Sequence, residues 1–143
     1  MPDDPASDDY LEVPPEVLAR LRPVCLGLPE AYEEQAWVGT RWRVRKKTFA
    51  HVLRVTPGRP PVHAKEASVD GPSTVLIFRS HGPELSVLTD TGYPFYRPQW
   101  GRDVVGMILH ADVDWTEVAE LVTESYCVQA PRKLVRLVDR PGV

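Results

Sequence analysis

Residues 41–55 read RWRVRKKTFAHVLRV, and this stretch decides the fold. Trp42 and Val44 alternate with arginines, and a second alternation follows from Phe49 onward, which is the period of half-buried β-strands. Two strands joined near residues 45–47 are therefore expected. The join contains neither Gly nor Asn, the residues that supply the positive φ of tight hairpin turns. The stretch predicts two paired strands without the usual signature of a two-residue turn.

The same stretch begins a basic island in an acidic chain. Residues 41–65 hold eight Lys or Arg and no Asp or Glu, whereas the whole chain has a formal net charge of -3 and a pI of about 5.8. Residues 1–34 carry nine acids against two bases. This segregation indicates a surface that meets a polyanion or an acidic protein face, although the overall acidity weakens the nucleic-acid interpretation.

The flanking segments supply helices and further strands. Before the hairpin, Pro14 and Pro15 can open an amphipathic helix that Gly27 and Pro29 end. After it, residues 74–78 are apolar and largely β-branched, which predicts a central strand. The pattern then predicts a short helix over 83–89, opened by residues 81–83 and closed by Gly92, an extended segment over 94–98, a strand over 103–110, a helix capped by Asp114 that runs to about Cys127, and a basic tail from Pro131 to Val138.

Grouped strands without regular strand–helix alternation predict a two-layer α+β fold. At 143 residues the chain suits one domain, which we expect over 13–138. An acidic, Pro-containing leader over 1–12 is expected to be disordered, and 139–143 form a flexible tail. Residues 56–72, rich in Pro and Gly, predict a long irregular connection.

Several segments together resemble the MmcQ/YjbR family of small bacterial proteins over roughly residues 17–134. They are Cys25-Leu-Gly-Leu-Pro29 before an acidic stretch, the segment from Trp42 to Ala50, residues 104–109 leading to Asp114-Trp115, and Glu124-Ser125-Tyr126. The resemblance implies an α-β(3)-α-β(2)-α two-layer fold, similar to that of secretion chaperones, with an antiparallel sheet packed by helices. It also implies a nucleic-acid-binding role. In this chain Arg45-Lys46 replaces the Gly or Asn common at the family's turn.

The basic hairpin is the candidate site. Alternate residues of a strand project from one face about 6.5 to 7 Å apart, close to the phosphate step along one nucleic-acid strand. Such a row would give a strongly salt-dependent affinity. In the competing interpretation the strand is a solvated outer strand, whose charges discourage edge pairing or bind acids of the same molecule, namely Glu30, Glu33 and Glu34. The predicted nucleic-acid contacts are Arg41, Arg43, Arg45, Lys46, Lys47 and Arg54.

Three functions compete. The first is a non-enzymatic module that binds DNA or another polyanion, and the second is a chaperone-like adaptor for an acidic protein partner. The third is a small-molecule pocket. Its expected lining is His81, Tyr93, Tyr96 and Trp100.

The aromatic and titratable residues favour structure over chemistry. Core packing explains the four tryptophans better than base stacking, most clearly for Trp42 and Trp115, while Trp100 is the one expected to be exposed. Ser125-Tyr126 predicts a structural hydrogen bond from the tyrosine to a neighbouring strand. No catalytic, metal or cofactor motif is found. We expect no cofactor, a cytoplasmic location by default and no membrane segment, and the oligomeric state stays open.

Overall fold

The computed structural model describes residues 12–56, 72–98 and 102–138. The predicted irregular connection lies almost entirely outside these residues, as do the predicted leader, apart from Glu12, and the predicted tail. Trp100 also lies outside them.

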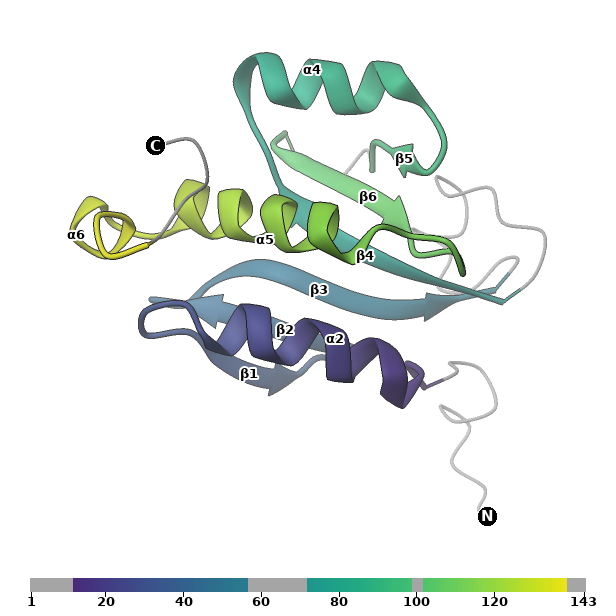
Figure 1. Cartoon of the computed structure of the whole chain (residues 1–143), viewed down its shortest axis with the longest axis horizontal. Helices are drawn as coiled ribbons and strands as arrows, with labels where there is room; N and C mark the ends of the chain where they lie inside the picture. The colour runs from purple at the N-terminus through teal and green to yellow at the C-terminus, as the bar shows by residue number, and fades with distance from the viewer. Residues whose placement is uncertain (1–11, 57–71, 99–101, 139–143) are drawn as a thin grey trace.

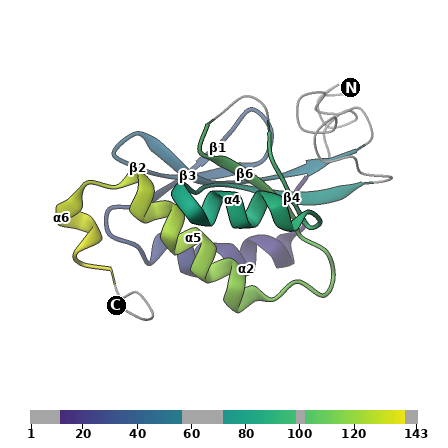
Figure 2. The same ribbon diagram turned by 90° about the horizontal axis from the view of Figure 1, so that it is seen from above.

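Within these residues, six antiparallel strands form one sheet in the order β1-β2-β3-β4-β6-β5. The two-layer α+β prediction is confirmed, since α2, α4 and α5 lie on one side of the sheet (Figures 1 and 2). The elements follow the chain as α2 (Pro15–Leu26), β1 (Tyr32–Gln35), β2 (Thr40–Val44), β3 (Lys47–Val55), β4 (Ser73–Arg79), α4 (Gly82–Thr91), β5 (Phe95–Tyr96), β6 (Val104–Ile108), α5 (Trp115–Gln129) and α6 (Arg132–Val135).

Strand β1 is an element that the sequence pattern does not predict. The resemblance implied three strands before the second helix, and the structure has four. The segment Tyr-Glu-Glu-Gln lacks the apolar alternation of a strand. It pairs with β2 in register, with Glu34 opposite Arg41 and Glu33 opposite Trp42. This edge strand is therefore marked by pairing of charges across the strands and not by alternating apolar residues.

A β-bulge in β3 places two consecutive residues in the core. Trp42 pairs with Ala50 and Arg43 with Thr48, so that Phe49 is the additional residue on the β3 side. Phe49 and Ala50 are both completely buried on the helix-covered face. The alternation read from sequence is therefore interrupted once, and beyond the bulge His51 and Leu53 project from the opposite face.

Helix α5 joins the two layers through its inward stripe. Asp114 accepts hydrogen bonds from the amides of Thr116 and Glu117, which confirms the predicted cap. Ser125 Oγ accepts from the Arg79 amide at 2.7 Å and donates to the Phe49 carbonyl at 2.5 Å, so it links β4 with β3. Tyr126 also makes a structural hydrogen bond, but it donates at 2.6 Å to Pro29 in the segment before β1, not to a strand.

Candidate nucleic-acid interface

The β2–β3 hairpin closes through a two-residue turn. Val44 pairs with Lys47, which leaves only Arg45 and Lys46 between the strands. Their φ angles are 50° and 68°, the pattern of a type I′ turn. Arg43 Nη2 donates to the Lys46 carbonyl and braces the turn from β2. The hairpin thus forms the tight turn that its sequence does not favour.

The arginines of β2 and of the turn are held by carboxylates of β1 and of the segment before it. Arg41 donates to Glu34 Oε1 through Nε at 2.8 Å and approaches it through Nη2 at 2.6 Å. Arg43 Nη1 lies 3.4 Å from the same oxygen. Arg45 forms two hydrogen bonds with Glu30, at 2.7 and 3.1 Å. The intramolecular pairing expected in the competing interpretation is therefore present for two of its three acids.

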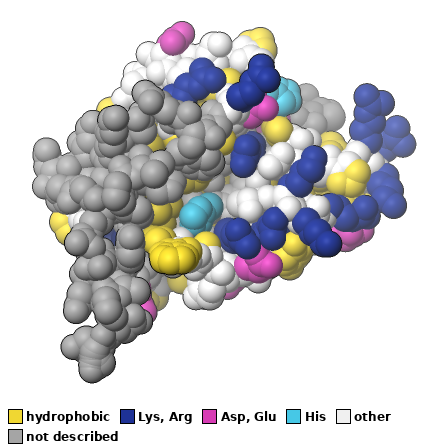
Figure 3. All heavy atoms as spheres, turned by 180° about the vertical axis from the view of Figure 1, so that it is seen from behind, with side chains coloured by type: hydrophobic (Ala, Val, Ile, Leu, Met, Phe, Trp, Pro, Cys, Tyr) yellow, Lys and Arg dark blue, Asp and Glu magenta, His cyan; other side chains and the backbone are white. Residues whose placement is uncertain are grey.

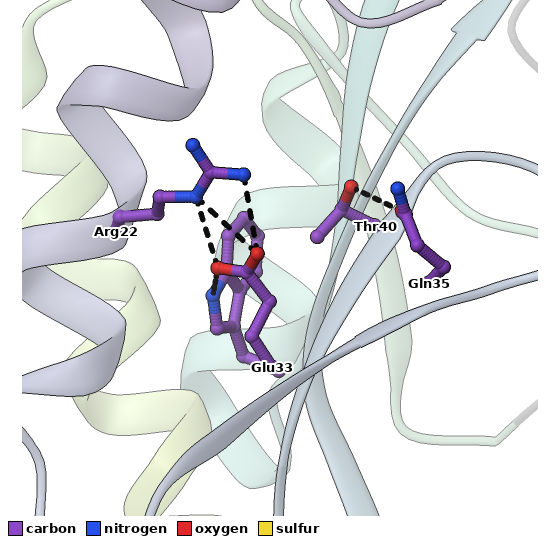
Figure 4. A network of polar contacts seen from close by, with 5 residues as sticks. Arg22, Glu33, Gln35 and Thr40 are labelled. Carbon is purple, nitrogen blue, oxygen red and sulfur yellow. Dashed lines mark hydrogen bonds and ion pairs between the residues drawn. The ribbon is translucent and has the colours of Figure 1, made fainter.

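Glu33 lies on the helix-covered face instead. Its carboxylate accepts from Nε and Nη2 of Arg22 on α2, and its Oε1 accepts from the Trp42 indole Nε1 at 3.0 Å (Figure 4). Thr40 donates to Gln35 on the same face. Neighbouring carboxylates of β1 thus serve opposite faces of the sheet, because successive strand residues alternate.

The arginines lower the pKa values of the carboxyl groups with which they pair. The hydrogen bond from Arg41 is the main cause that lowers the pKa of Glu34, and the hydrogen bond from Arg45 does the same for the pKa of Glu30. Lys133 of α6 also lowers the pKa of Glu30 through its charge. Glu30 therefore lies close to both the hairpin turn and α6.

Six cations lie at the end of the molecule that carries both the turn and α6 (Figure 1), and we call this group the basic end. The six side chains are all exposed, and within the described residues Arg45 alone of the six has an ion-pair partner. Figure 3 shows Lys and Arg side chains concentrated toward this end of the molecule, which Figure 1 shows at the α6 side. The basic end consists of Arg45, Lys46, Lys47, Arg132, Lys133 and Arg136.

The structure divides the six residues predicted to contact nucleic acid. Arg41 and Arg43 lie on the face opposite the helices. Arg45, Lys46 and Lys47 are exposed at the turn. Arg54 is not on the face of Arg41, because it pairs with Thr74 and donates to its hydroxyl at 3.0 Å on the helix-covered side. Arg54 lies after the bulge and two residues from buried Val52, so both side chains project from the helix-covered face.

The cations of α6 are the residues that sequence reasoning missed. The sequence predicts only a basic tail from Pro131 to Val138, yet Arg132–Val135 form a short helix anchored by Leu134, which is 4% exposed. The signal available in the sequence was an apolar residue, Leu134, among basic residues. Burial of this leucine packs the tail on the core and places the basic residues at the same end of the molecule as the hairpin turn (Figure 1).

Trp37 is contrary to expectation, and one residue of the predicted small-molecule site lines a pocket. Trp42 is completely buried as predicted and Trp115 is partly buried, but the core prediction is wrong for Trp37, which is 92% exposed. Among the described residues, a pocket of about 330 Å³ lies between α4 and α5, and its lining includes His81 but neither Tyr93 nor Tyr96. In the described part of the chain, no group of three His, Cys, Asp or Glu residues is arranged to hold a metal ion.

One sheet with helices on one face and a cluster of cations at one end defines a small α+β protein whose most distinctive surface is electrostatic. The chain matches the YjbR family model over residues 26–128, and it therefore belongs to the YjbR family. A search of curated proteins found no match. Among the described helices, none has the length and apolar character needed to cross a membrane.

Proposed function

We propose that this chain is a non-enzymatic nucleic-acid-binding protein that contacts phosphates through its basic hairpin and α6. The observation that carries the proposal is the turn itself, in which Arg45 and Lys46 both adopt positive φ. Such a conformation costs about 1 kcal/mol or more for a residue with a Cβ, and Asn-Gly is the favoured pair. The proposal includes a DNA-binding activity and a cytoplasmic location.

A cost of this kind supports a functional role for the charges. Strained backbone conformations cluster at binding and active sites, where the side chain matters more than local stability. Lys46 and Lys47 are exposed and contribute no side chain to the core. Three further cations, from α6 and its C-cap Arg136, belong to the same end of the molecule (Figure 1), although they are more than eighty residues away in the sequence. Convergence of these charges at one end suits a polyanion.

Glu30 and Glu34, which pair with the arginines, suit this role as well. Phosphate oxygens and carboxylate oxygens accept the same forked hydrogen bonds from a guanidinium group. Glu34 and Glu30 therefore hold the arginines extended in the geometry that a phosphate would use. Binding would exchange a carboxylate for a phosphate at Arg41 and Arg45, and the lysines would supply attraction without such an exchange.

The test is the double variant R45N/K46G, which restores the favoured turn and removes two cations. We expect its free energy of unfolding to rise by about 1–2 kcal/mol. We also expect its affinity for a fluorescent oligonucleotide at low salt to fall several-fold, because two phosphate contacts are lost. The single variant Arg54→Ala removes a cation from the other face and should leave affinity almost unchanged.

Unchanged affinity in R45N/K46G would overturn the assignment to the hairpin. If the native chain bound neither duplex nor single strand at low salt, nucleic-acid binding itself would be wrong. An acidic protein partner would then be the favoured ligand. The immobilised native chain should capture this partner from nuclease-treated lysate, and immobilised R45N/K46G should not.

A further inference from the structure

Trp37 presents an entire aromatic side chain to solvent. It is 92% exposed, whereas Trp42, five residues later, is completely buried. A tryptophan side chain offers about 150–250 Å² of largely apolar surface, which folding ordinarily removes from water. Trp37 therefore lacks the hydrophobic stabilisation that the burial of Trp42 gives to the fold.

The loop that carries Trp37 is fastened on both sides of it. Ala36 donates to the Gly39 carbonyl at 3.0 Å and closes the loop. The Val38 carbonyl accepts at 2.6 Å from His51 on β3, and the Val38 side chain packs on the apolar cluster of the face opposite the helices. Because a carbonyl only accepts, His51 Nε2 carries the proton. These contacts hold the loop against the sheet while Trp37 points away.

Gly39 makes this attachment tight. Its φ is +80°, and a Cβ at this position would lie 2.0 Å from the Val52 carbonyl oxygen. Only glycine allows the loop to approach β3 so closely. The backbone beside Trp37 is thus fixed by packing, and the ring is displayed from a rigid support, which lowers the entropy cost of using it for binding.

The loop that carries Trp37 lies on the same side of the sheet as the arginines. His51, which holds the loop, pairs with Arg41 across β2 and β3, so both project from the face opposite the helices. From this loop, β2 runs through Arg41 and Arg43 to the turn, about 13 Å at 3.3 Å per residue. An aromatic platform stands at one end of a row of guanidiniums, and the basic end stands at the other.

We infer that Trp37 stacks on a base of a single-stranded nucleic acid whose phosphates follow β2 toward the basic end. This inference rests on the proposed function and specifies its ligand. Aromatic side chains bind the face of any base, and single strands expose that face, whereas a duplex keeps its bases stacked. The occupant that suits an exposed indole beside guanidiniums is therefore a single strand.

The experiment compares three fluorescent ligands of equal length: oligo-dT, an abasic strand with the same phosphates, and a duplex. Trp37→Ala should weaken oligo-dT binding about 10-fold, which corresponds to about 1.4 kcal/mol and one lost stack. It should leave the abasic strand and the duplex within twofold of the native affinity. Trp37→Phe should retain part of the oligo-dT affinity, and Val87→Ala, a truncation of another exposed apolar side chain, should change none of the three.

The outcomes separate the two proposals. Equal losses for oligo-dT and the abasic strand, or no loss at all, would overturn the stacking role of Trp37 while phosphate binding stood. If the native chain bound none of the ligands at low salt, both proposals would fail. An unchanged melting temperature of Trp37→Ala would show that the variant is folded, as its exposure leads us to expect.

Discussion

At the scale of single residues, Glu34 controls how much positive charge the sheet presents. Its one carboxylate is shared by Arg41 and Arg43, so the pair keeps a surplus cation. The carboxylate also competes with any phosphate for the same guanidinium hydrogens. Glu34 therefore holds Arg41 and Arg43 in place and at the same time competes with phosphate binding to them.

Glu34→Gln should raise the affinity for an oligonucleotide several-fold, because it releases the two arginines without changing the shape of the side chain. Glu33→Gln is the matched control, since it removes the same formal charge from the adjacent position on the helix-covered face. Fluorescence anisotropy titrations of both variants decide the matter. An equal rise in both would assign the effect to net charge alone.

His51 should make stability depend on pH. Burial is the main cause that lowers its pKa from the ordinary 6.5, and the charge of Arg41 acts in the same direction. Below about pH 6.5 the unfolded chain binds more protons than the folded chain, so stability falls as the pH decreases until it passes the folded pKa. Urea denaturation between pH 7.5 and 5 should show this loss, and His51→Gln, whose amide can still donate to Val38, should flatten it. An identical slope in the variant would contradict the role of the imidazole.

Residue patterns predict some of these positions and not others. The period of two was enough to place Trp42 in the core and Arg41 with Arg43 on the other face, because alternation is a local property of a strand. The exposure of Trp37 depends on the contact between Gly39 and β3, which lies in no local pattern. The alternation along the strand was enough to group Arg54 with Val52. That Arg54 lies on a different face from the other arginines became clear only from its pairing with Thr74.

At the scale of elements, the helices and the central strands were predictable because their signals are apolar. Strand β1 was not, since its pairing depends on salt bridges with β2. Helix α6 was not either, because four residues are too few for a periodic signal. Both missed elements are those that position charge, so the sequence revealed the core of the fold more fully than the candidate site.

The hydroxyl of Ser125 is a polar contact that α5 makes with both β3 and β4. Ser125→Ala should lower the free energy of unfolding by about 1–3 kcal/mol, because the Arg79 amide and the Phe49 carbonyl both lose a buried partner. Thr123→Ala provides the control, as its hydroxyl only bonds to the Ala119 carbonyl within α5. Denaturant unfolding of the two variants should differ clearly, and equal losses would contradict the bridging role.

At the scale of the whole molecule, folding brings together basic segments that the sequence keeps apart. An acidic chain thereby acquires one strongly basic end, and the charge of this end should set the salt dependence of binding. Removing α6 cations with R132A/K133A/R136A should reduce the slope of log affinity against log salt by about 0.7–0.9 for each lost phosphate contact. Arg54→Ala should leave the slope unchanged, and an unchanged slope in the α6 variant would exclude α6 from the interface.

The turn at Arg45 and Lys46 also bears on how the chain reaches its fold. Strands β1 to β4 pair in sequence order, so β2 and β3 can meet as soon as this turn closes. Hairpins form in about 1–10 μs when the turn is favourable, and two bulky cations at positive φ oppose that step. If the hairpin belongs to the folding transition state, R45N/K46G will fold faster and unfold at nearly the native rate. The charges at the tip would then be maintained at the expense of folding speed.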